Sequence, residues 1–507
     1  MNIKQAKQEI TNTLKAYLAK DQLGNYLIPT VRQRPVLLMG PPGVGKTQIM
    51  EQIAAETGVG LVAYTITHHT RQSAIGLPFI EKRTYGGEEV SVTEYTMSEI
   101  LSSVYRLMER TGLQEGILFL DEINCVSETL APMMLQFLQC KTFGNQALPE
   151  GWLIVAAGNP PEYNKSVRDF DVVTLDRVKR IDVEEDYGVW KEYARRKNLH
   201  GAILSYLDIK KDNFYRIENT ADGLQFATAR GWEDLSELLY AYETLGIRAD
   251  REVVGQYIQM PRIAKDFANY LEMFYKYQKT YHVEGILSGT WENITVLELR
   301  EAPFDEKLSV MGLVLSRLSE EARNTRCQDA LTDALHTSLT EFREKIADAP
   351  PLTVLDRLLW KRRTAMKQAK EAGQLDKESR DLKQREINAL EDYRQRLDRE
   401  AVAPEGAMDA VRGWFGEEVE RRKAVAMETK DMFDNAFRFL ETTFGNSQEL
   451  VIFVTEITVG YNTSWFVEQF GCDAYFRHNR ELLFDSTRHR IREEIAAAKA
   501  AEQEENT

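Results

Sequence analysis

Near its N-terminus the chain reads Val36-Leu37-Leu38-Met39-Gly40-Pro41-Pro42-Gly43-Val44-Gly45-Lys46-Thr47. The apolar run ends at Met39, and the glycine-rich loop is followed by an amphipathic stretch over residues 48–56. Strand, glycine loop and helix, with the pattern GxxxxGK(S/T) in the loop, are the context of a phosphate-binding loop. Its glycines let backbone N–H groups point at phosphate oxygens, and the helix N-terminus adds positive potential. We expect Lys46 to reach the β- and γ-phosphates of a nucleotide and Thr47 to ligate Mg²⁺.

Polar side chains end two further apolar runs. The run 117–120 leads into Asp121 and Glu122, and the run 153–156 leads to Asn159. We expect Asp121 to hold Mg²⁺ through its water shell and Glu122 to polarise an attacking water, which favours hydrolysis over transfer to a small acceptor. Asn159 is expected to bond the γ-phosphate or that water. Taken alone, each motif is also compatible with an ordinary solvated strand end.

Four short apolar runs occur in the first part of the chain, at residues 36–39, 61–64, 117–120 and 153–156. Each is bounded by Gly, Pro or polar residues, and helical stretches separate them. Continuous apolar runs that alternate with helices are typical of parallel strands buried on both faces. The pattern therefore predicts an α/β core with a parallel sheet flanked by helices.

The order of these motifs resembles the AAA+ superfamily and, within it, the MoxR family, over about residues 1–275. The resemblance rests on residues 40–47 (Walker A), 120–124 (Walker B), 156–161 (sensor 1) and 76–78 (Gly-Leu-Pro). Residues 175–177 are similar to the family's Leu-Asp-Arg-Phe box, and residues 228–232 to its sensor-2 box. The chain departs from these boxes at Val178, where Phe is usual, and at Ala229, where Pro is usual.

The resemblance implies an ATPase that works as a ring, most often of six subunits. Arg177 would be the arginine finger that enters a neighbouring subunit's site, and Arg180 is the alternative finger or else a surface cation. Arg230 would contact the γ-phosphate in cis. The implied ligands are ATP and Mg²⁺, although nothing distinguishes ATP from GTP. MoxR-like ATPases typically act with a protein that carries a von Willebrand A domain, so the resemblance implies remodelling or chaperone-like maturation of such a partner.

The pattern divides the chain into three parts. We expect an AAA+ α/β core over residues 1–185, a helical lid over 186–282 and a mainly α-helical C-terminal region over 283–507. Mixed charges with sparse leucines predict a helical hairpin at about residues 352–401 that turns near Gly373, either a solvated spacer or a coiled-coil arm. Aromatic residues within 408–484 suggest a further core. A hairpin at 79–95 and the segment 141–145 are candidate pore elements, with ordinary surface loops as the alternative.

Composition, net charge and motifs together disfavour several classes of function. The net charge of −15 disfavours general nucleic-acid binding, although a nucleic-acid motor or loader remains the alternative function. Glu122, Asn159 and the candidate arginines disfavour a scaffold that holds ATP without turning it over. The helical sensor-2 lid and the arginine box disfavour a small-molecule kinase. The four cysteines are far apart and the N-terminus lacks a signal-peptide pattern, so we expect a soluble cytoplasmic protein without a membrane span.

Overall fold

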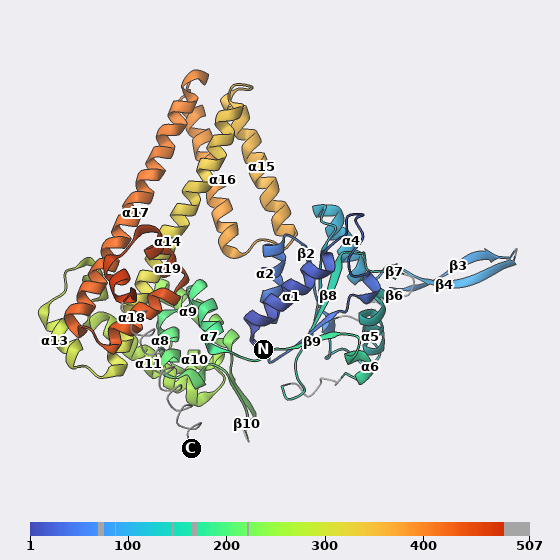
Figure 1. Cartoon of the computed structure of the whole chain (residues 1–507), viewed down its shortest axis with the longest axis horizontal. Helices are drawn as coiled ribbons and strands as arrows, with labels where there is room; N and C mark the ends of the chain where they lie inside the picture. The colour runs from blue at the N-terminus through green and yellow to red at the C-terminus, as the bar shows by residue number, and fades with distance from the viewer. Residues whose placement is uncertain (69–75, 87, 144–145, 164–169, 221–222, 481–507) are drawn as a thin grey trace, which may run out of the picture. The chain divides into compact units, whose positions relative to one another are not determined.

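The computed structural model describes residues 1–68, 76–86, 88–143, 146–163, 170–220 and 223–480. The chain forms two compact units (Figure 1). The first contains Met1–Val189 together with Glu341–Ala401, and the second contains Trp190–Thr340 and the described residues from Val402 onward.

A five-stranded parallel sheet forms the centre of the first unit, with the strand order β2-β5-β8-β1-β9. The strands are β1 (Val36–Met39), β2 (Gly60–Thr65), β5 (Gly116–Asp121), β8 (Trp152–Gly158) and β9 (Lys179–Asp182). The four apolar runs of the sequence are β1, β2, β5 and β8, so the predicted α/β fold with a parallel sheet is confirmed. Because all strands run in the same direction, their carboxyl ends meet at one edge of the sheet.

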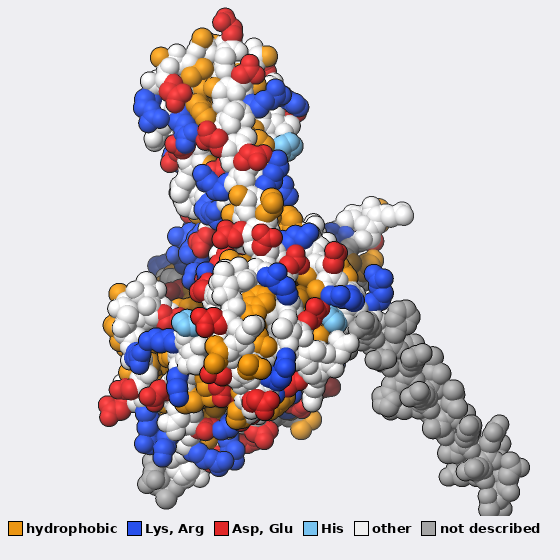
Figure 2. Space-filling view, turned by 90° about the vertical axis from the view of Figure 1, so that its left-hand side faces the viewer, with side chains coloured by type: hydrophobic (Ala, Val, Ile, Leu, Met, Phe, Trp, Pro, Cys, Tyr) orange, Lys and Arg blue, Asp and Glu red, His pale blue; other side chains and the backbone are white. Residues whose placement is uncertain are grey.

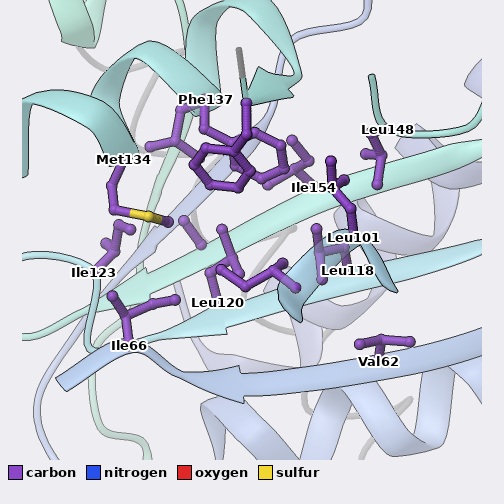
Figure 3. Packing of buried hydrophobic residues seen from close by; sticks show 14 of the residues in the cluster. Val62, Ile66, Leu101, Leu118, Leu120, Ile123, Met134, Phe137, Leu148 and Ile154 are labelled. Atoms are coloured by element: carbon purple, nitrogen blue, oxygen red, sulfur yellow. The ribbon is translucent and has the colours of Figure 1, made fainter. Parts of the chain in front are cut away.

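Alternate residues of the strands enter two separate hydrophobic cores, as the side-chain period of a strand requires. On one face, Leu118, Leu120 and Ile154 pack against α4 (Glu99–Thr111) and α5 (Ala131–Cys140), with Met134 and Phe137 above the sheet (Figure 3). On the other face the intervening strand residues pack against α1 (Ile3–Leu18) and α2 (Lys46–Thr57). This double burial explains why these strands are apolar throughout.

A two-stranded antiparallel ribbon extends away from the sheet (Figure 1). It consists of β3 (Pro78–Tyr85) and β4 (Glu88–Tyr95), paired in register from Pro78 opposite Tyr95 to Tyr85 opposite Glu88. Every residue of β3 is exposed. The predicted hairpin at 79–95 is confirmed as a structure. The second candidate segment forms β6 (Thr142–Phe143), which pairs with β7 (Gln146–Ala147), while residues 144–145 lie outside the described residues.

The predicted helical hairpin is also confirmed, as α15 (Pro351–Glu371) and α16 (Lys377–Arg399) with a turn at Gly373, whose φ is +70°. It belongs to the same compact unit as the sheet. Arg110 of α4 pairs with Glu371 at 3.0 Å, and the Gln374 side chain donates to the carbonyl of Val59 at 3.3 Å. The turn of the hairpin therefore contacts the core beside the edge strand β2.

The second unit is mostly helical, as the sequence indicates. After α7 (Tyr187–Arg196) come α8 (Gly201–Ile209), α9 (Ala229–Leu245), α10 (Arg251–Tyr257), α11 (Pro261–Thr280), α12 (Val283–Ser288), α13 (Asn293–Glu301), α14 (Phe304–Lys345), α17 (Ala407–Phe444), α18 (Gln448–Val459) and α19 (Tyr461–Phe470). A short ribbon of β10 (Arg216–Thr220) and β11 (Gly223–Ala227) interrupts the helices. The C-terminal aromatic residues do form a core, with Phe433, Phe437 and Phe466 fully buried.

No single helix among the described residues is long and apolar enough to cross a membrane. The pair α18 and α19 has the required length and composition, but the chain bends by 88° between the two helices.

Candidate nucleotide site

The glycine loop follows β1 and leads into α2 at the carboxyl edge of the sheet. Gly43 and Gly45 have φ values of 78° and 93°, a backbone region that residues with a Cβ rarely adopt, so these positions require glycine. At Gly40 a Cβ would come within 2.9 Å of the Val183 carbonyl oxygen. The loop is thus shaped by backbone geometry, as a phosphate cradle requires.

Lys46 is the first residue of α2, and its side chain, only 8% exposed, reaches back to the start of the loop. Its ammonium donates to the carbonyl oxygens of Gly40 and Pro41 at 2.7 and 2.8 Å, and to the Asn159 side-chain oxygen at 2.8 Å. The two carbonyl oxygens occupy positions beside the cation that phosphate oxygens could take. The structure therefore brings together Lys46 and Asn159, which are far apart in the sequence.

Thr47 and Asp121 meet on adjacent parts of the same edge. The Thr47 hydroxyl donates to Asp121 Oδ2 at 3.0 Å, and Asp121 Oδ1 accepts from the backbone N–H of Glu122 at 2.9 Å. Hydroxyl and carboxylate oxygens are the ligand atoms that Mg²⁺ prefers. The pair therefore fits the expected magnesium site.

Glu122 directly follows β5 and has φ 57°, in the left-handed region that is uncommon for a residue with a Cβ. Such strain is frequent at functional sites, where the surroundings hold it in place. The Glu122 carboxylate accepts from the Thr67 hydroxyl at 2.8 Å. Thr67 lies just after β2, in the short helix η2 (Ile66–His68). It belongs to none of the motifs, so sequence reasoning missed it.

Asn124 is a second residue at the site for which the sequence motifs predict no role. Its side chain is buried, donates to the Asn159 carbonyl at 2.7 Å and accepts from the Asn159 backbone N–H at 3.3 Å. A Cβ at Gly158 would lie 2.6 Å from Asn124 Oδ1, so the close approach needs glycine there. Asn124 thus fixes the backbone of the residue that contacts Lys46.

The candidate fingers are exposed and engage local side chains. Arg177 follows α6 (Val172–Leu175) and donates to the Gln139 side chain. Arg180 lies in β9 and pairs with Asp182 at 2.9 Å. Both arginines thus have a partner within the chain and remain exposed to solvent.

Arg230 belongs to the second unit, in the first turn of α9. The helix begins at Thr228, whose hydroxyl caps it by accepting from the Gly231 N–H at 3.3 Å. Arg230 is exposed. Asp234 lies one turn further along the helix, and burial raises the pKa of its carboxyl, whereas the positive charge of Arg230 opposes that rise. Because Thr228 caps the helix, α9 begins regularly even though Ala229 stands where proline is usual.

Comparison with known proteins agrees with this geometry. Residues 35–178 match the family model described as AAA domain (dynein-related subfamily). No curated protein matches the chain. The matched segment contains the glycine loop, the acidic pair and Asn159, and an AAA domain of this kind binds nucleotide. Residues 35–178 are thus an AAA domain, which indicates an ATPase, a hydrolase that acts on ATP.

Proposed function

We propose that this chain is a MoxR-like, Mg²⁺-dependent AAA+ ATPase whose ring, of six subunits, remodels a partner protein in the cytoplasm. The observation that carries the catalytic part is the convergence of Lys46, Thr47, Asp121 and Asn159, with Glu122 beside them, at one edge of the sheet. The match over residues 35–178 supports the ATPase part of the proposal.

Each residue has a distinct part in hydrolysis. Lys46 exchanges its carbonyl partners for phosphate oxygens when ATP binds the loop, and Asn159 holds that ammonium in position. Glu122 accepts a proton from the attacking water once its carboxylate leaves the Thr67 hydroxyl. Mg²⁺, held by Thr47 and Asp121, would neutralise developing charge on the phosphates.

The catalytic roles are tested with Glu122→Gln, which keeps the shape of the side chain but removes its basicity. We expect ATP to bind with unchanged affinity while hydrolysis falls at least about a hundredfold, as is typical for loss of a general base. A variant that still hydrolyses ATP at the normal rate would remove Glu122 from the mechanism. Comparing ATP with GTP in the same assay settles the nucleotide preference.

The ring is supported by the exposure of both candidate fingers, which leaves them accessible to a neighbouring subunit. A mixing experiment tests the trans arrangement. Arg177→Ala carries an intact site without a finger, and Glu122→Gln carries a finger without an active site. Mixed rings should recover activity that neither variant has alone, because the finger of one completes the site of the other. Arg180→Ala is the matched variant, and recovery with it instead would reassign the finger.

The identity of the partner protein is the most specific part of the proposal. It rests on the resemblance to MoxR proteins and on the exposed ribbon β3–β4, which we assign as a pore-facing client contact. Glu122→Gln protein, isolated from its host in ATP and Mg²⁺, should retain a protein with a von Willebrand A domain at near-stoichiometric yield. Lys46→Ala, which cannot hold ATP, should not. Nuclease-sensitive nucleic acid in place of that partner would support the motor alternative.

A further inference from the structure

A cavity of about 640 Å³ lies in the helical unit, where α9, α11, α12, α13 and α14 meet. Its volume is in the range of sites for small molecules. All its lining residues belong to the second compact unit, whereas the nucleotide site belongs to the first. The proposed ATPase mechanism makes no use of this cavity.

Aromatic rings form much of its wall. Phe274 and Tyr281 are buried, and Tyr240 is half-buried. Trp291 already accepts a cation on its ring, because the guanidinium of Arg438 lies 4.9 Å from the ring centroid. Such faces attract ammonium and guanidinium groups and the apolar stems that carry them.

The charge of the lining is strongly one-sided, with five glutamates against a single arginine. Arg317 pairs with Glu284 at 3.2 Å and with Glu320 at 2.6 Å, and outside the lining with Glu321 at 2.9 Å, so its single positive charge is shared among three carboxylates. Within the described chain, Glu292 and Glu298 form no ion pair. Elsewhere, on the face shown in Figure 2, acidic and basic side chains are intermixed, which is the usual arrangement of a charged surface.

The remaining lining groups agree with an acidic site. Glu243 accepts a bond from the buried His200 at 2.9 Å, and although burial opposes ionisation, that bond lowers the pKa of Glu243 below its ordinary value. His282 borders the cavity with φ 43°, a strained conformation for a residue with a Cβ. It leads into α12 and its carbonyl accepts from the Gly285 N–H at 2.7 Å.

The spacing of these acids decides between kinds of cation. In the part of the chain that the structure describes, no three His, Cys, Asp or Glu side chains are grouped closely enough to hold a metal ion. Carboxylates spread over a wide, aromatic-walled cavity instead match a cation whose charges are separated along an apolar stem. We propose that this cavity binds an organic polycation, with ammonium groups at Glu292 and Glu298 and the stem along Tyr240 and Phe274.

This chemistry has two sources, a free polyamine or the lysine side chains of a basic peptide. Isothermal titration calorimetry of the full chain at low salt, with spermidine in one arm and a tetralysine peptide in the other, separates them. The test variant is Glu292→Gln with Glu298→Gln. The matched control is Glu272→Gln with Glu301→Gln, which makes the same charge change at two exposed positions of α11 and α13 outside the lining.

We expect one saturable site that the test variant weakens about tenfold, because Glu292 and Glu298 are both exposed and ion pairs of exposed carboxylates are individually weak. The control should bind like the wild type. Binding of spermidine alone supports a small-molecule site, and binding of the peptide alone supports capture of a partner's lysines. No saturable binding in either arm, or equal weakening in both variants, would overturn the proposal by reducing it to general attraction to an acidic protein.

Discussion

Replacing Asn124 with alanine removes both side-chain bonds that hold the backbone of Asn159. The bond to the Asn159 carbonyl is 2.7 Å long and the bond from its N–H is 3.3 Å, so the first contributes more. Asn124 is only 3% exposed, and water replaces it poorly. We expect the free energy of unfolding to fall by about 2 kcal/mol, the sum of one good and one weak hydrogen bond with partial loss of solvation.

The same change should act on catalysis more than on binding. Asn159 Oδ1 contacts Lys46 at 2.8 Å, and a displacement of about 1 Å in such a group costs up to roughly 10²-fold in rate. The loop backbone at residues 40–45 is untouched, so we expect ATP affinity to change less than about threefold. Steady-state ATPase assays and nucleotide titration measure the two quantities separately.

Asn124→Asp makes the test sharper, because it keeps the shape and the acceptor but turns the donor toward the Asn159 carbonyl into a second acceptor. A protonated aspartic acid can donate there, so folding raises the pKa of the introduced carboxyl. Its stability deficit should therefore be large at pH 8 and shrink as the pH falls toward 5. Urea unfolding at both pH values measures this, with the exposed Asn388→Ala as control. Wild-type stability of Asn124→Asp at pH 8 would refute the reasoning.

Three further changes test other parts of the first unit. Burial lowers the pKa of Lys141 from 10.5 to about 8, so between these pH values the unfolded chain binds more protons than the folded chain, and stability rises with pH. Lys141→Met should remove that rise and stabilise the protein at pH 7 by on the order of 1–3 kcal/mol, measured by urea unfolding. Gly40→Ala places a Cβ 2.9 Å from the Val183 carbonyl oxygen, so it should cost about 1–3 kcal/mol and weaken ATP binding, measured by thermal unfolding and nucleotide titration. Bonds from Lys345 and Lys361 lower the pKa of Glu341 to about 2, so Glu341→Gln should destabilise the protein at pH 7, and the difference from wild type should vanish as the pH falls from 4.5 toward 2 in acid unfolding curves.

Local patterns were sufficient for the parts of the fold that local physics determines. Strands β1, β2, β5 and β8 are recognisable because burial on both faces makes them apolar throughout. Strand β9 has no such run, since it lies at the edge of the sheet and only Ile181 is buried in it. The ribbon β10–β11 was likewise missed within a segment that reads as helical.

The site divides in the same way. The glycine loop and the acidic pair are each contiguous in the sequence, so their spacing revealed them. Thr67 reaches Glu122 because β2 lies beside β5, and Asn124 reaches Asn159 because β5 lies beside β8. Strand order is a property of the whole sheet, and no pattern within one segment specifies it.

The contact between the helical hairpin α15–α16 and the core has a consequence for the order of synthesis. Residues 1–189 contain all five strands, yet the segment 341–401 that completes their compact unit is translated much later. At about 5–20 residues per second, the interval between residues 189 and 401 is roughly 10–40 s. During that time the surface beside β2 stays exposed to solvent on the ribosome. It includes the Val59 carbonyl, to which the Gln374 side chain later donates. The nascent core must therefore stay folded without the segment 341–401 until that segment has been synthesised.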